Sequence, residues 1–492
     1  MDRRGPGWKK IVPSPQVRQI LCNGLPVFQV DRPGLTQAGL IFRVGQADES
    51  VTTRGISHLV EHLALSSVDS SLLHNGTVGQ TATTFLARGT PDEVAVILRT
   101  VCSNLASLPV GRTELESRVL RTEAAQRKAG PPAHLANLRF GYQAYGLSVL
   151  REYFLDSPKT DLVQKWSVEK FNKANCAMWV AGELPADMEL PLPDGTRSGM
   201  SVAPQIPYLS LPAGGTLTRD VVVVDYFSPR TSASTVNAGI LAKCLHDDVR
   251  LSKGLSYEIG GNREAHSADL AENTIWMTTL TDHAGQGCDA FLSILQRLAS
   301  AGPTEEELAA NLQAYMRSRA DPDAAAHSVA YAANAVLEGR AFQTQEELLD
   351  ERRLVTVESC AEELRSCLNT AIFATPRFIG GRPAWLNQYP STRSPVSGET
   401  YRPVKSKPWG KTKTLVAGPA GISFVPMEGD GATVQWSECV GLVAMKDGRR
   451  VVLGRDGFSV SVAPTEWRRG TQLTQVIDRA VDPELHIVPD PA

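Results

Sequence analysis

One segment, residues 55–65 (GISHLVEHLAL), constrains the fold more than any other part of this sequence. On one face of a helix it places His58, Glu61 and His62 close together. On another face, apolar residues recur at the three- and four-residue spacing of a buried helix: Ile56, Leu59, Val60, Leu63 and Ala64. The segment therefore predicts a helix that packs on a core and presents three polar side chains together.

The spacing of these polar residues is typical of a metal site. Residues four apart on a helix lie one turn above each other, so His58 and His62 can bind one Zn²⁺ ion. Glu61 lies beside them, where a carboxylate can accept a proton from water. With 9 His in 492 residues, the H-x-x-E-H pattern arises by composition in roughly one such chain in a hundred. The competing interpretation is a solvent-facing helix whose histidines pair with Glu61.

A third zinc ligand is expected from a neighbouring element. Residues 113–129 (TELESRVLRTEAAQRKA) have the periodicity of a helix, with Glu116 and Glu123 two turns apart on about the same face. On this pattern either carboxylate can reach inward. The alternative is a charged surface helix whose glutamates pair with its own arginines.

Length and composition are those of an ordinary globular protein. The 492 residues favour two to four domains, and a net charge of -3 gives no basic surface for nucleic acid. The eight cysteines are scattered without a C-x-x-C pair, which indicates reduced thiols. No stretch of 18 apolar residues occurs, and no apolar segment follows the charged N-terminus, so we expect no membrane span and a cytoplasmic location.

The order of predicted elements indicates two lobes of similar design. Residues 19–45 alternate around an Asn23-Gly24 turn and a Pro33-Gly34 turn, which predicts paired strands. Helices and a closing strand at 176–184 follow, before a Pro/Gly/Ser-rich connector at 186–215. From Thr216 a comparable order of strands and helices begins again.

The C-terminal part has a different character. Residues 383–412 have several prolines and poor periodicity, as a linker does. Short strands separated by Gly-Asp and Asp-Gly turns then precede a helix at 470–481, which predicts a small β-barrel closed by one helix. We therefore predict an α+β protein with units at 1–205, 216–382 and 413–492.

The histidine segment and its surroundings resemble the pitrilysin family of peptidases (M16), which carries an inverted zinc motif, H-x-x-E-H, on a helix. The segments NGLPVF (23–28), VGQADES (44–50) and GISHLVEHL (55–63) stand in the family's order. The resemblance covers roughly residues 15–380. It implies two similar lobes, each an antiparallel-rich sheet packed with helices, that form a clamshell. The C-terminal barrel lies outside it and looks like a pleckstrin-homology domain.

The resemblance assigns roles to the residues around the motif. Zn²⁺ would be held by His58, His62 and Glu123, with Glu116, seven residues earlier, supporting the ligands. Glu61 would take a proton from water and pass it to the leaving amine. Glu123 follows His62 by 123 − 62 = 61 positions. This spacing is shorter than is usual in the family, which indicates that a helix after the motif is trimmed.

Two further features are assigned to substrate by the resemblance. In VRLSKGLSYEI (249–259), Arg250 and Tyr257 match a pair that engages substrate across the cleft and would help to stabilise the oxyanion. The alternative is a helix-end arginine and a tyrosine packed in a strand. A substrate-binding edge strand is expected near residues 79–85, with Thr81 in place of the family's asparagine; its residues are Gly79, Thr81, Ala82, Thr83 and Thr84.

These features predict a zinc-dependent endopeptidase that cleaves extended peptides, for example in leader or precursor processing, as a homodimer or a heterodimer with a related subunit. One alternative is a non-catalytic partner subunit in which zinc is structural. Another is an adaptor that binds lipid or protein through a basic cluster of the C-terminal unit: Lys446, Arg449, Arg450 and Arg455. Surface polar roles are expected for the remaining histidines, which have no ligand-spaced neighbours: His74, His134, His246, His266, His283, His327 and His486.

Overall fold

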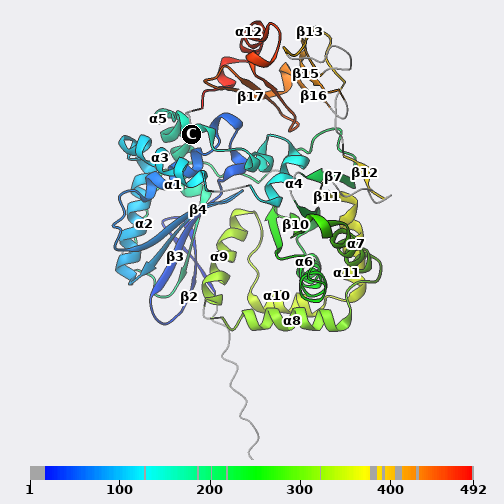
Figure 1. Ribbon diagram of the computed structural model, residues 1–492. Helices are drawn as coiled ribbons and strands as arrows, with labels where there is room; N and C mark the ends of the chain where they lie inside the picture. Colours follow the sequence, from blue (N-terminus) through cyan, green and yellow to red (C-terminus); the bar gives the residue numbers. More distant parts are fainter. Residues whose placement is uncertain are drawn as a thin grey trace, which may run out of the picture.

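The computed structural model describes residues 17–126, 129–185, 188–200, 202–217, 220–321, 323–376, 385–389, 394–404, 413–427 and 431–489. The charged N-terminus and about half of the predicted linker at 383–412 (383–384, 390–393 and 405–412) lie outside the described residues. Two six-stranded sheets packed with helices lie side by side, and the C-terminal unit lies at one end of both (Figure 1). The α+β architecture with two lobes is thus confirmed.

The first sheet has the strand order β1-β2-β6-β3-β5-β4. Asn23 and Gly24 have positive φ (50 and 83) and join β1 to β2 as the predicted hairpin. The pairing expected across Pro33-Gly34 is wrong, because β6 lies between β2 and β3. Every residue of β6 is buried, and a strand that is apolar on both faces suits the centre of a sheet. The strands are β1 (Arg18–Cys22), β2 (Leu25–Val30), β3 (Thr36–Phe42), β4 (Leu73–Val78), β5 (Thr83–Gly89) and β6 (Cys176–Ala181).

Four helices complete the core of the first lobe: α1 (Ile56–Leu65), α2 (Pro91–Ala106), α3 (Thr113–Ala124) and α5 (Thr160–Lys170). Helix α2 begins at the N-cap Thr90, whose side chain accepts from the Glu93 amide while the Glu93 carboxylate accepts from the Thr90 amide. No single helix of the described residues has the length and apolar character to cross a membrane; by those criteria alone the bent pair Pro91–Ala106 and Val110–Ala124 (87°) passes.

The second sheet repeats the topology of the first. Its order is β12-β7-β11-β8-β10-β9, in which β7-β11-β8-β10-β9 correspond to β2-β6-β3-β5-β4 with the same parallel and antiparallel pairings. The strands are β7 (Ala213–Leu217), β8 (Val221–Pro229), β9 (Ile259–Ala265), β10 (Leu270–Thr278), β11 (Ile372–Pro376) and β12 (Asn387–Gln388). The helices are α6 (Ser232–Cys244) with its π-helical continuation η7 (Leu245–Ser252), α7 (Ala284–Ala301), α8 (Glu305–Ser318), α10 (Gln345–Arg353) and α11 (Val357–Cys367).

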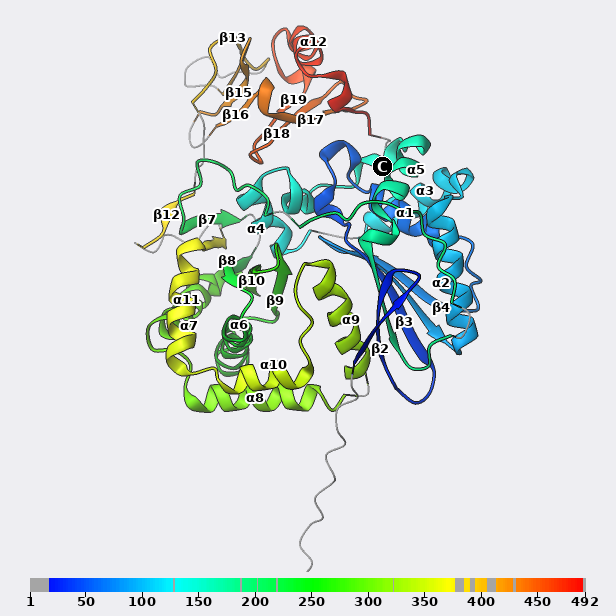
Figure 2. The ribbon, with the colours of Figure 1, turned by 180° about the vertical axis from the view of Figure 1, so that it is seen from behind.

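One helix of each half packs on the other lobe. Helix α9 (Ala324–Leu337), which follows α8 in the chain, packs its small residues, including Ala332 and Ala333, against Phe28 and Trp179 of the first sheet. Figure 2 shows α9 beside the first sheet. Helix α4 (Pro131–Phe140) places Leu135 against the second sheet. The two lobes are therefore joined by shared cores as well as by the connector.

Helix α4 also carries a buried charge across the junction. Arg139 is fully buried; its Nε lies 2.9 Å from Asp225 Oδ1 and 3.3 Å from Glu272 Oε1. Burial, together with the charge of Glu272, raises the pKa of Asp225 to about 7 against the opposing effect of Arg139. His266 Nε2 lies 3.0 Å from Glu272 Oε2, and the imidazole stacks on Tyr145 at 3.7 Å. His266 is 0% exposed, so the surface role expected for it is wrong.

In its described residues the C-terminal unit consists of two four-stranded sheets and one α-helix. The predicted barrel is not closed, because the sheets β13-β14-β15-β16 and β19-β18-β17-β20 share no strand pairing in the described residues. Two strands come from the segment that was expected to be a linker: β12 pairs with β7, and β13 pairs with β14. The elements are β13 (Glu399–Tyr401), β14 (Thr414–Gly418), β15 (Gly421–Val425), β16 (Ala432–Gln435), β17 (Cys439–Ala444), β18 (Arg450–Gly454), β19 (Ser459–Val462), α12 (Gly470–Ala480) and β20 (His486–Ile487).

Candidate metal centre

The entry to helix α1 is fixed by a buried carboxylate. Glu49 accepts hydrogen bonds from the amides of Gly55 and Ser57, both at 3.0 Å, and pairs with Arg54 at 2.9 Å. A carboxylate is favoured at this position because the N-terminus of a helix carries a partial positive charge. Gly55 has φ 101, and a Cβ there would lie 2.6 Å from Glu152 Cβ. The helix therefore starts at one defined position beside Glu152.

Helix α1 brings the three motif residues together as predicted. His58 Nε2 lies 3.9 Å and His62 Nε2 lies 3.8 Å from Glu61 Oε2. One ligand atom from each of the three residues lies within 4.8 Å of the others. His58 and Glu61 are buried and His62 is half-buried, so the solvent-facing helix considered above is wrong.

Each imidazole is oriented by a carboxylate on its other nitrogen. His58 Nδ1 lies 3.0 Å from Glu152 Oε1, and His62 Nδ1 lies 3.4 Å from Glu116 Oε2. Burial lowers the pKa of His58. Its hydrogen bond to Glu152 and the charges of the surrounding carboxylates together raise this pKa by more, so the net shift is upward. For His62, burial and the charge of His58 lower the pKa against the effect of Glu116. Carboxylates that accept from Nδ1 leave both Nε2 lone pairs directed at the site.

Helix α3 delivers the two candidate glutamates to different places. Glu116 lies behind His62, where Arg112 also pairs with it at 2.9 Å. Glu123, on the last turn, places Oε2 at 3.8 Å from His62 Nε2, on the same side as Glu61. Glu123 thus faces the site and Glu116 contacts His62 from behind. The role of Glu123 as a metal ligand stays a prediction, since the ligand atoms that lie within 4.8 Å of one another in the described residues belong to His58, Glu61 and His62.

A cavity of about 520 Å³ surrounds this group, and strand β4 forms one of its walls. Strand β4 is an edge of the first sheet, so one side of its backbone pairs with no other strand in the described part of the chain. The expected edge at 79–85 is therefore corrected. Thr83 and Thr84 belong to β5, which is paired on both sides, and Gly79, Thr81 and Ala82 form the turn before it.

Arg250 and Tyr257 lie elsewhere on the surface. Arg250 is on η7, and its guanidinium lies 5.4 Å from the ring centre of Tyr257, which is 84% exposed. The two residues contact each other, yet neither lines the cavity around the histidines. Their role in substrate binding stays a prediction.

Sequence reasoning missed several residues of the site. Glu152, which orients His58, comes 94 positions later in the chain and belongs to no spacing pattern. Gly76 lies against Glu61, and a Cβ on it would clash with that side chain. His74 and Asn75 also line the cavity. His74, Asn75 and Gly76 all lie on β4, and only the edge position of this strand, which depends on the whole sheet, could have identified them.

The donor set fits zinc. Zn²⁺ is typically bound by imidazole nitrogens and carboxylate oxygens, with three protein ligands in catalytic sites. His58 and His62 supply two nitrogens that lie within 4.8 Å of each other and of a Glu61 oxygen, and Glu123, which also lines the cavity, adds a carboxylate oxygen 3.8 Å from His62 Nε2. Both imidazoles have the carboxylate partners that metal-bound histidines commonly have.

Comparison with solved structures identifies the fold. A protease from Helicobacter pylori and a peptidase M16 inactive domain from Pseudomonas fluorescens each align with a TM-score of 0.61 at 14% identity, over 74% of this chain and 100% of theirs. Pitrilysin aligns with a TM-score of 0.55 at 15% identity, over 77% of this chain and 46% of its own. This chain has the fold of the M16 peptidases. No protein-family profile and no curated sequence matches it.

Proposed function

We propose that this protein is a zinc-dependent endopeptidase that cleaves extended peptides at the His58, Glu61 and His62 site. The observation that carries the proposal is the convergence of both Nε2 atoms, Glu61 and Glu123 on one cavity beside β4, whose outer edge pairs with no strand among the described residues. The M16 fold supports a peptidase-like role, and the residues of this chain support the chemistry.

When bound, zinc would polarise the peptide carbonyl and lower the pKa of the attacking water. Glu61 is placed to accept the proton of that water and to donate it to the leaving nitrogen. Glu61 is 4% exposed, and a site that excludes solvent strengthens the electrostatic interactions within it. Glu152 and Glu116 keep the imidazoles in the tautomer that binds metal.

The substrate would pair its backbone with strand β4. An extended peptide that adds a strand to an exposed edge gains main-chain hydrogen bonds whatever its side chains. Gly76 on β4 lies directly against Glu61, so a peptide paired there passes the proton-transferring group. This arrangement favours unstructured peptides, such as leader or precursor segments, over folded proteins.

The decisive test uses Glu61→Gln and His62→Ala with a library of unstructured peptides. We expect the zinc-loaded wild type to cleave, Glu61→Gln to retain zinc without cleavage, and His62→Ala to lose both. Glu114→Gln is the matched control, since Glu114 is 69% exposed on helix α3. Full hydrolysis by Glu61→Gln, or none by the zinc-loaded wild type, would reject the proposal.

A second candidate is a non-catalytic M16 subunit that binds peptides or proteins. The outward position of Tyr257 favours it, because the predicted substrate pair does not reach the histidines within one chain.

We propose that the protein acts as a dimer, with itself or with a related subunit, and in the cytoplasm, where its eight unpaired cysteines would stay reduced. Mass measurement in solution and turnover by the isolated chain distinguish the two candidates.

A further inference from the structure

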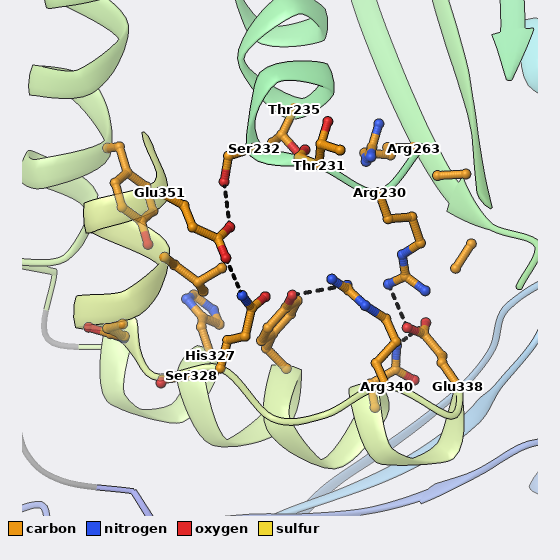
Figure 3. Close-up of a pocket in the computed structure, with 18 of the residues that line it drawn as sticks. Arg230, Thr231, Ser232, Thr235, Arg263, His327, Ser328, Glu338, Arg340 and Glu351 are labelled. Atoms are coloured by element: carbon orange, nitrogen blue, oxygen red, sulfur yellow. Dashed lines mark hydrogen bonds and ion pairs between the residues drawn. The ribbon is translucent and has the colours of Figure 1, made fainter. Parts of the chain in front are cut away.

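A second cavity, of about 640 Å³, lies between the two lobes. The first lobe contributes the turn Gly79–Ala82 between β4 and β5. The second lobe contributes the start of α6, the end of β9, and helices α8 to α10. In Figure 3, Arg230 and Arg340 reach into this space from opposite walls.

The lining of this cavity carries more positive than negative charge. Its arginines are Arg230, Arg263, Arg319, Arg340 and Arg352, and its glutamates are Glu264, Glu338 and Glu351. Arg230 pairs with Glu338 at 2.5 Å, and Arg319 pairs with Glu346, outside the lining, at 2.9 Å. Burial raises the pKa of Glu264 to about 7, which reduces its negative charge at neutral pH.

Three of the arginines pair with no carboxylate in the described residues. Arg340 donates to the Tyr331 hydroxyl at 3.2 Å, and Arg352 lies 3.9 Å from the ring centre of Tyr315. Arg263 donates only to neutral oxygens, including Ser228 and Asn273. These contacts orient the guanidinium groups but do not neutralise them. Glu363 interacts electrostatically with Arg263, but Arg340 and Arg352 lie in a lining whose arginines outnumber its glutamates, and such a lining favours an anionic ligand.

The arginine-lined cavity adjoins the cavity around the histidines along the chain. Val78, the last residue of β4, lines the histidine cavity, and Gly79, the next residue, lines the arginine cavity. A peptide paired with β4 opposite Gly76 therefore leaves the strand at the turn Gly79–Ala82. Because 79 − 76 = 3 and 82 − 76 = 6, a peptide that rises by about 3.4 Å per residue beside this segment enters the second cavity about three to six residues from the bond beside Glu61.

We infer that this cavity binds a carboxylate-rich segment of the peptide substrate through Arg263, Arg340 and Arg352. This inference rests on the proposed function and specifies its substrate class. The carboxylates come from acidic side chains or from a peptide C-terminus, which offer the same chemistry to a guanidinium group. Arginine is suited to either because its planar fork forms two parallel hydrogen bonds with a carboxylate.

The test compares Arg340→Gln and Arg352→Gln with the wild type on matched peptides. One peptide has four glutamates, beginning four residues from the cleavage site, and its partner has four glutamines. A second pair places these residues on the other side of the bond, and a third compares a free with an amidated C-terminus. Arg353→Gln is the control, because Arg353 is adjacent on α10 but points to Asp350 rather than lining the cavity.

We expect kcat/KM to favour one of the acidic peptides, or the free C-terminus, by about tenfold, the factor that one charge-assisted hydrogen bond contributes. Arg340→Gln and Arg352→Gln should each reduce this preference in kcat/KM, and Arg353→Gln should not. Equal cleavage of all matched peptides by the wild type would overturn the inference while leaving the endopeptidase proposal intact.

Binding of the same labelled peptides to Glu61→Gln protein, measured by fluorescence anisotropy, separates the two proposals. If no peptide is cleaved but acidic peptides bind through Arg340 and Arg352, the cavity inference holds and the catalytic proposal fails. If acidic and neutral peptides bind equally, the cavity inference fails whatever the turnover.

Discussion

Glu61 lies so close to Gly76 that a Cβ atom added to the glycine would sit 1.8 Å from Glu61 Oε1. The edge strand β4 is therefore the wall against which the carboxylate rests. The backbone of Gly76 is not in the left-handed region, so the requirement for glycine here is one of space.

Gly76→Ala should move Glu61 from this position, or move β4 away from it. Misplacing a catalytic group by about 1 Å costs on the order of a hundredfold in rate, so we expect kcat to fall by about that factor. Zinc content should remain, because His58, His62 and Glu123 are not displaced. Gly111→Ala is the control, since a Cβ there has nothing within 4 Å. Unchanged peptide cleavage by Gly76→Ala would show that Glu61 does not act from this position.

Glu152→Gln tests the carboxylate that orients His58. The substitution keeps the shape of the side chain but removes the charge that lies 3.0 Å from Nδ1. Losing such a partner typically weakens metal affinity about 10- to 100-fold, which competition with a zinc chelator measures. Glu169→Gln, 55% exposed on α5, should bind zinc as the wild type does. If Glu152→Gln binds zinc as tightly as Glu169→Gln does, Glu152 does not orient His58 for metal binding.

The limits of sequence reasoning differ between local and long-range features. Helix α1 and the spacing of Glu116 and Glu123 follow from periodicity, which local sequence encodes. The position of β6 between β2 and β3 does not, because strand order depends on contacts between distant segments. For the same reason the edge strand was placed at 79–85 rather than at Leu73–Val78, and Glu152 was missed. The prediction of Glu123 as a ligand rests on its spacing from Glu116, which resembles a family pattern.

The burial of His266 could not be predicted from sequence spacing. It implies that the stability of the protein depends on pH. Burial lowers its pKa to about 3 in the folded protein, below the usual 6.5. The unfolded chain therefore binds a proton below pH 6.5 that the folded chain does not. The stability that neutral His266 contributes, relative to its protonated form, is complete above pH 6.5. It is lost as the pH falls from 6.5 towards 3, by up to about 1.4 kcal/mol of unfolding free energy per pH unit.

His266→Phe should remove this contribution and keep the aromatic contact with Tyr145. The difference in the free energy of unfolding between wild type and variant, measured with urea at pH 7.5, 6.0 and 5.0, should move in favour of the variant as the pH falls. Asp225 and Glu272, whose raised pKa values act in the opposite direction, are present in both proteins. Because Glu272 loses its 3.0 Å contact with His266 in the variant, the readout is the change of the difference with pH rather than its absolute size. His246→Phe, with a 43% exposed histidine, should show no such trend. A difference that stays constant over this range would contradict a neutral, buried His266.

The C-terminal unit is predicted to stabilise the first lobe, because one of its sheets is covered on both faces. In β17, Leu442 packs in the core of the unit and the next residue, Val443, packs with Val51 and Leu147 of the first lobe. Successive side chains of a strand point to opposite faces, so this alternation places the sheet between two cores. Val51 lies two residues from Glu49, which fixes the start of helix α1. Docking of the C-terminal unit therefore bears on the position of the histidines.

Val443→Asp should disrupt this docking while leaving the core of the C-terminal unit in place. Burying an unpaired carboxylate costs at least about 2 kcal/mol, so we expect the unit to unfold or detach first, with a lower melting temperature and reduced peptide cleavage. Val488→Asp is the matched control, because Val488 is 60% exposed just after β20. Hydrogen exchange of helix α1 provides the specific measurement. Faster exchange there in Val443→Asp supports a stabilising role, whereas unchanged exchange together with unchanged cleavage would show that the unit is only tethered to the lobes.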